Sequence, residues 1–224
     1  MPDSDGAAPL RSTRIDEEAR ISPVQPGLRF SEEMTGLVNK GSTDPKEGYR
    51  NPAAVAMTLR AAVTIANLPA FLTDANHRGR WDAEVAIPVW GRHIRSTDHG
   101  DFRLFQRDFG TDGKPVREMV YDTSIAAGEH TYLMRGRKII QPGPPWRFWP
   151  ATTTLYVTFF ELDRPEQVVA AGIFQLTPLG FLRQLSTMRI TGDFPSSAKL
   201  RQLWLFVKFF AGSLARTYIL GRRW

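Results

Sequence analysis

Lys138 is the residue whose position most clearly suggests chemistry. It belongs to the alternation Tyr132, Met134, Gly136, Lys138 and Ile140, so along a β-strand it would share one face with apolar neighbours. A lysine inside a barrel needs a partner carboxylate or gives up its charge. Such an amine could donate a proton, form a Schiff base or anchor a carbonyl group. The alternative is that Lys138 lies near a strand end and extends its amine into water.

Glu32 and two tyrosines could supply the remaining proton-transfer groups. Glu32 interrupts the apolar face of the first expected strand, where it could be a general acid or base, an exposed edge residue, or the partner of an arginine. Tyr121 and Tyr132 fall on strands that we expect to be neighbours. A tyrosine and a carboxylate in an apolar pocket can polarise a carbonyl and move a proton, as in isomerases, although a buried tyrosine can also simply bond to the backbone. The catalytic candidates are therefore Tyr121, Tyr132, Lys138 and Glu32.

Five further residues are expected to contact a ligand. They are Tyr156, Glu118, Trp81, Phe102 and Trp149. Glu118 flanks Tyr121 but would face the other side of its strand. Trp149 belongs to the proline-rich segment 142–150, which cannot join a sheet ladder and could cap a cavity, dock a partner, or pack under the terminal helix.

Several kinds of catalytic site are excluded or disfavoured. The chain has no cysteine, which removes disulfides, thiolate metal sites and thiol catalysis. His93 and His99, near Asp98 and Asp101, match no established metal-ligand spacing. Neither a G-x-S-x-G nucleophile elbow nor a G-x-G-x-x-G dinucleotide fingerprint is present. We therefore expect no metal and no cofactor.

The elements that would position these side chains are mostly strands. Residues 55–65 are the clearest example, with an apolar residue at every second position. Short helices are expected at 66–74 and 178–186, and a long helix at 196–219, where apolar residues recur at three- and four-residue steps. The expected strands include residues 28–38, 55–65, 81–87, 102–105, 119–125, 131–140, 152–162, 168–176 and 188–191.

A sheet of about nine strands joined by hairpin turns tends to curl or close. We therefore expect a mainly β protein, namely an antiparallel β-barrel or strongly curved sheet of the calycin or lipocalin type, with short helices and a long C-terminal helix. Residues 1–27 are expected to be a flexible leader and residues 28–224 a single domain. The 14 Phe, 6 Trp and 5 Tyr could line a ligand cavity or fill the core.

One segment resembles the opening of a bacterial accessory domain. Phe30-Ser31-Glu32-x-Met34-x-Gly36 is similar to its F-[ST]-E-x-M-x-G motif. Further similar segments are Tyr132-x-Met134-x-Gly136-x-Lys138, Thr152-Thr153-Thr154-Leu155-Tyr156, Ala171-Gly172-Ile173 and Phe181-x-x-Gln184-Leu185-Ser186-Thr187-Met188-Arg189. That domain accompanies glucose–methanol–choline-type oxidoreductases of the cholesterol-oxidase-like group and α/β-hydrolase fusions. The resemblance implies a setting in sterol, terpenoid or lipid metabolism but not oxidase activity, because the flavin fingerprint is missing.

Charge is distributed unevenly along the chain, whose formal net charge is +6. Residues 1–27 have a net charge of −2, whereas residues 195–224 contain six bases and no acid. Such a basic end could attract phosphates, an anionic membrane surface or an acidic partner, and no nucleic-acid-binding motif is visible. No apolar run reaches the roughly 18 residues of a membrane span, and no secretory signal is visible, so we expect a cytoplasmic protein.

These observations favour a protein that binds a hydrophobic small molecule of the sterol, terpenoid or polyketide kind in a barrel cavity. Isomerisation or cyclisation without a cofactor fits the candidate residues. The alternative is a non-catalytic module that docks onto an oxidoreductase, a hydrolase or a membrane surface.

Overall fold

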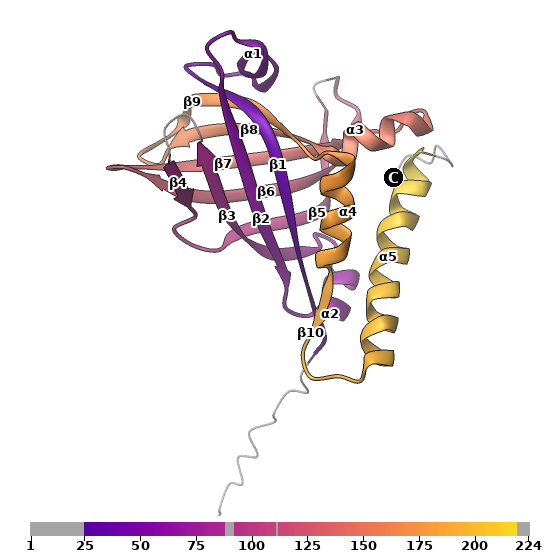
Figure 1. The fold of residues 1–224 in the computed structure, drawn as a ribbon. Coiled ribbons are helices and arrows are strands. Elements are labelled where there is room, and N and C mark those ends of the chain that lie inside the picture. Colours follow the sequence, from indigo (N-terminus) through magenta and orange to yellow (C-terminus); the bar gives the residue numbers. More distant parts are fainter. Residues whose placement is uncertain (1–24, 88–91, 111, 219–224) are drawn as a thin grey trace, which may run out of the picture.

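Eight antiparallel strands close into a barrel in the computed structural model, which describes residues 25–87, 92–110 and 112–218 (Figure 1). The ring runs β1-β2-β3-β5-β6-β7-β8-β9, and β9 pairs back onto β1. Its strands are β1 (Gly27–Lys40), β2 (Val55–Ile65), β3 (Arg78–Ile87), β5 (Gly100–Phe109), β6 (Pro115–Ala127), β7 (His130–Ile140), β8 (Thr154–Glu161) and β9 (Arg164–Gln175). The predicted mainly β barrel with a long C-terminal helix is confirmed.

Two short strands extend the sheet. β4 (Arg92–Arg95) pairs with β3, and β10 (Arg189–Thr191) pairs with the start of β1. β4 was not predicted, because a four-residue strand is too short to show a clear period in the sequence. The predicted leader lies almost entirely in residues 1–24, outside the described residues.

Helices occupy several of the connections. They are α1 (Pro45–Arg50), α2 (Leu68–Thr73), the 3-10 turn η2 (Pro145–Arg147), α3 (Phe148–Thr153), α4 (Pro178–Thr187) and α5 (Ser196–Tyr218). Asp44, Asn67 and Thr177 accept hydrogen bonds from backbone amides in the first turns of α1, α2 and α4, and each of these helices has a proline near its start. The proline-rich segment 142–150, which was predicted not to join a sheet ladder, includes η2 and the start of α3.

The barrel interior is mainly apolar and is covered at one end by helices. α2 follows the end of β2, and Phe71 of α2 lies 6.4 Å from Phe206 of α5, between ring centroids. A bulge in β5 turns Phe105 (φ +56°) toward Phe209 and Phe210 of the same helix. β2 and β7 finish at this end of the antiparallel barrel, so α2 and α5 shield the last residues of both strands from water.

The seam that closes the barrel depends on glycine. β1 and β9 pair from Thr35–Gln175 to Lys40–Ala170. A Cβ at Gly172 would lie 2.1 Å from the carbonyl oxygen of Leu37, and one at Gly36 would lie 2.0 Å from that of Ile173. The two backbones can therefore approach each other only where a side chain is missing.

Candidate functional site

Glu32, Tyr121 and Lys138 meet inside the barrel, although they come from β1, β6 and β7. Lys138 Nζ donates a hydrogen bond to Glu32 Oε2 at 2.8 Å. The same ammonium lies 5.1 Å from the centre of the Tyr121 ring. Only 2% of the Lys138 side chain and none of the Glu32 side chain is exposed. These three residues are called the interior polar cluster below.

The alternating pattern of the strands explains why the charges point inward. Glu32 falls on the same face of β1 as Phe30 and Met34, which are buried. Lys138 lies two residues before the end of β7, where it could have reached water. It does not, because helices cover this end of the barrel.

The electrostatic setting of the cluster is unusual for a protein core. Burial raises the pKa of the Tyr121 phenol well above its usual value, and the negative charge of Glu32 adds to this shift. Tyr121 therefore remains neutral, and its hydroxyl is able to donate a hydrogen bond. A hydrogen bond between the Tyr121 phenol and the Glu32 side chain also contributes to this shift of the Tyr121 pKa. Glu32 Oε1 is buried, and no described residue donates a hydrogen bond of good geometry to it. A buried carboxylate oxygen with incomplete hydrogen bonding is destabilising, so this atom retains the capacity to accept a further hydrogen bond.

Two predicted ligand-contacting residues pack around the cluster. The Trp81 and Phe102 rings lie 5.3 and 5.1 Å from the Tyr121 ring, both edge to face. Trp81 Nε1 donates a hydrogen bond to the carbonyl oxygen of Asp122 at 3.1 Å, which fixes the plane of the indole. The wall that bears Tyr121 is therefore rigid and aromatic.

Small residues lie beside the cluster, and the sequence analysis did not select them. Ala61 and Ala83 lie level with Glu32 on the neighbouring strands β2 and β3. Gly136 of β7 pairs with Tyr121 of β6. A Cβ at Gly136 would lie 3.3 Å from Tyr121 Cβ and 3.0 Å from Leu155 Cδ1. A glycine within an expected strand is a signal of close approach and would have found Gly136.

Tyr132, the fourth catalytic candidate, does not join the cluster. It shares a face of β7 with Lys138, but six residues separate them, which is roughly 20 Å along a strand. Tyr132 is half-buried, and its ring lies 6.2 Å from the ring of His130 at the other end of β7. Its predicted role remains a prediction.

Three predicted ligand-contacting residues lie outside the barrel. Tyr156 alternates with the buried Leu155 and Val157, so it belongs to the outer face of β8. Trp149 of α3 packs edge to face on Phe181 of α4, with 5.5 Å between ring centroids. Neither Trp149 of the proline-rich segment 142–150 nor Tyr156 contributes to the interior polar cluster.

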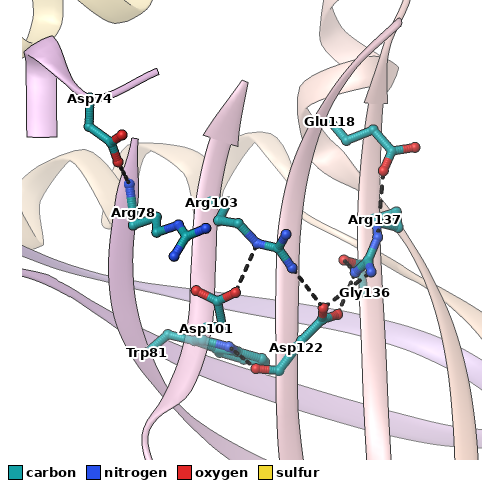
Figure 2. Close-up of polar contacts among 9 residues, drawn as sticks. All are labelled: Asp74, Arg78, Trp81, Asp101, Arg103, Glu118, Asp122, Gly136 and Arg137. Atoms are coloured by element: carbon teal, nitrogen blue, oxygen red, sulfur yellow. Dashed lines mark hydrogen bonds and ion pairs between the residues drawn. The ribbon is translucent and has the colours of Figure 1, made fainter. Parts of the chain in front are cut away.

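Glu118, the third of them, belongs to a chain of charges on the outer face (Figure 2). Asp122 binds Arg137 and also accepts a hydrogen bond from Arg103 Nη2 at 3.2 Å. Arg103 Nε lies 2.8 Å from Asp101, and Arg137 Nε lies 3.5 Å from Glu118. Burial raises the pKa of Glu118, and nearby Asp108 adds to the rise. The ion pairs that link Arg103 to Asp122, Asp122 to Arg137 and Arg137 to Glu118 each cross between neighbouring strands, so the network joins β5, β6 and β7.

The histidines show no arrangement that suggests a metal centre. Within the described ranges, no group of three or more ligating side chains is placed to hold a metal ion. His93 Nδ1 lies 3.2 Å from Glu84, whereas His99 Nδ1 lies 2.6 Å from Asp82. The two histidines therefore have different acidic partners.

Comparisons with known proteins add no assignment. No protein-family model, curated protein or solved structure matches this chain. The resemblance to the accessory domain of cholesterol-oxidase-like enzymes thus remains a prediction from sequence motifs. Among the described helices, none combines the length and apolar character needed to cross a membrane.

Proposed function

We propose that this protein binds a hydrophobic small molecule of the sterol, terpenoid or polyketide kind inside the barrel, and that the interior polar cluster is the contact point for the ligand's oxygen. The observation that carries the proposal is the meeting of Glu32, Lys138 and Tyr121 in a largely apolar interior. Tyr121, whose pKa is strongly raised, lies among them, and titratable groups perturbed in this way are often functional. The sequence resemblance, which implies sterol or terpenoid metabolism, supports the same class of ligand.

The chemistry of the cluster suits a ligand that carries a carbonyl or hydroxyl group. Glu32 Oε1 would accept a hydrogen bond from a hydroxyl, and the Tyr121 phenol or the Lys138 ammonium would donate one to a carbonyl. The apolar body of the ligand would lie against Trp81 and beside Ala61, which pairs with Glu32 on the neighbouring strand β2.

The same three groups could isomerise a ketone without a cofactor. Glu32 would take a proton from the carbon next to the carbonyl, while Tyr121 and Lys138 stabilise the enolate oxygen by hydrogen bonding. Return of that proton to a different carbon of the enolate system would move the double bond, with no net change in atoms or electrons. A cyclisation would use the same acid and base on an electrophilic carbon elsewhere in the ligand.

Thermal-shift and deuterium-exchange measurements test binding and catalysis separately. The full chain is screened against sterol, terpenoid and polyketide ketones, and the proposal predicts a rise in Tm with at least one class. Tyr121→Phe should reduce that rise, whereas Tyr49→Phe on α1, the matched control outside the barrel interior, should not. For a catalyst, the bound ketone gains deuterium from heavy water, and Glu32→Gln abolishes the exchange.

The outcomes distinguish the alternatives. A shift without deuterium exchange supports binding alone and removes the isomerase proposal. No shift with any class, or a shift that Tyr121→Phe leaves intact, contradicts the assignment of the interior polar cluster as the ligand site.

A further inference from the structure

α5 carries an apolar stripe that the barrel does not cover. Leu200, Trp204 and Val207 follow one another at four- and three-residue steps, so they lie on one face of the helix. Leu200 is 69% exposed, Trp204 64% and Val207 36%. A different face of the helix, with Phe206, is buried in the core. The helix thus has a second apolar surface besides the one that packs on the barrel.

Bases accompany this stripe and acids do not. Arg201 and Lys208 each follow a stripe residue by one position, which places them about 100° round the helix. Both are exposed, and α5 contains no Asp or Glu among its 23 residues. Its other bases are Lys199 and Arg216, so the helix has a formal charge of +4.

α4 has the same character and lies on the same side of the barrel (Figure 1). Leu179, Leu182 and Leu185 are exposed at three-residue steps, with exposed fractions of 71%, 62% and 45%. The helix contains one base, Arg183, and no acid. A run of exposed leucines on a short helix is costly in water unless another surface covers it.

We propose that α5 and α4 dock in the plane of an anionic membrane surface. Trp204 and the exposed leucines would insert among the acyl chains near the headgroups, where tryptophan is favoured. Arg201 and Lys208 would extend their cationic groups to the anionic headgroups beside the stripe. Charge selects this occupant, because both helices combine an apolar surface with bases and no acid. The inference does not depend on what the barrel binds.

Vesicle co-sedimentation of the full-length protein tests the docking surface. The protein should sediment with vesicles of phosphatidylcholine and phosphatidylglycerol and much less with phosphatidylcholine alone. Leu200→Ser/Trp204→Ser should lower the partition coefficient by roughly tenfold or more. Arg201→Glu/Lys208→Glu should lower it by roughly tenfold or more as well. All four positions are exposed on α5, so the fold should be retained, which circular dichroism verifies.

Matched variants elsewhere on the surface control for charge and apolarity. Lys46→Glu/Arg50→Glu on α1 makes the same change in net charge, and Leu162→Ser removes an exposed leucine from the β8–β9 turn. Both should bind vesicles as the wild type does. In addition, binding of the wild type should weaken as salt is raised, a result that needs no variant.

Three outcomes would overturn the proposal. The first is equal sedimentation with neutral and anionic vesicles, and the second is an equal loss of binding in the α1 control variant. The third is an absence of vesicle binding together with a dimer in light scattering that Leu200→Ser/Trp204→Ser converts to monomer, since the surface would then bind a second copy of this chain.

Discussion

Glu32 and Lys138 form an ion pair where isolated charges would be strongly destabilising. Each charge loses its hydration in the barrel, and their mutual attraction offsets that loss only while both are present. The pair is therefore not explained by stability, because apolar side chains of similar volume would fill the same space at no greater cost. This is the residue-scale reason for assigning the cluster to a ligand.

Variants of the ion pair should behave as a coupled unit. Lys138→Met alone leaves the Glu32 carboxylate buried without its cation, and we expect it to lower the free energy of unfolding by about 3–5 kcal/mol. Glu32→Leu/Lys138→Met should regain most of this loss or exceed the wild type. Urea denaturation measures both. A double variant as unstable as the sum of the single variants would contradict the account, since the ion pair would then be a structural requirement.

The raised pKa of Glu118 gives a pH dependence with a definite sign. A carboxyl whose pKa is higher in the folded state binds its proton more tightly there, so it favours folding at low pH. Its contribution is lost as pH rises from about 4.5, its ordinary pKa, through the folded value. The difference in free energy of unfolding between wild type and Glu118→Gln should therefore fall over this window. A flat or rising difference would show that Arg137, not burial, dominates the site.

At the scale of the elements, the β1–β9 seam is the most sensitive junction. Gly172→Ala would bring a methyl group to 2.1 Å from the Leu37 carbonyl oxygen, so β1 and β9 would have to separate. We expect a loss of roughly 2 kcal/mol or more in free energy of unfolding, seen as a lower Tm.

Gly212→Ala on α5 is the matched control for Gly172→Ala, because it makes the same substitution where there is room for the methyl group. No atom lies within 4 Å of the position a Cβ would take at Gly212, and alanine favours a helix interior over glycine. It should stabilise the protein by up to about 1 kcal/mol. Equal tolerance of alanine at both positions would mean that the seam is looser than its geometry indicates.

The strands were predictable from the sequence because the period of two runs through most of them. Residues 55–65 form β2 with the predicted bounds, and α5 begins at the predicted Ser196. α1 was missed, although Asp44 and Pro45 are its start signals, because six residues are too few for a helical period.

The sequence allowed two positions for the Lys138 amine, inside the barrel or in water at a strand end, and the first is observed. Its partner Glu32 was not predictable. Glu32 and Lys138 are 106 residues apart, and their contact depends on how the barrel closes. A sequence pattern assigns a residue to a strand face, whereas the register between distant strands determines which residues meet. For the same reason, Tyr132 looked equivalent to Tyr121 but lies toward the other end of β7.

At the scale of the whole molecule, the proposed ligand site and the proposed docking surface lie toward the same end of the barrel. β2 and β7 finish at the barrel end that α2 and α5 cover, and Lys138 is two residues from that end of β7. The exposed stripe lies on the outer face of the same α5 helix. A protein that takes a hydrophobic molecule from a lipid surface would need such proximity, so the two proposals are compatible while remaining separately testable.

Native mass spectrometry of the purified full-length protein, with solvent extraction of any retained compound, tests the central claim most directly. We predict that the wild type carries a lipophilic molecule containing a carbonyl or hydroxyl group, and that Glu32→Leu/Lys138→Met is folded but empty. Retention of the same molecule by both proteins, or a wild type that is empty and gains no ligand from the sterol, terpenoid and polyketide ketones, would contradict the claim that the interior polar cluster holds a ligand.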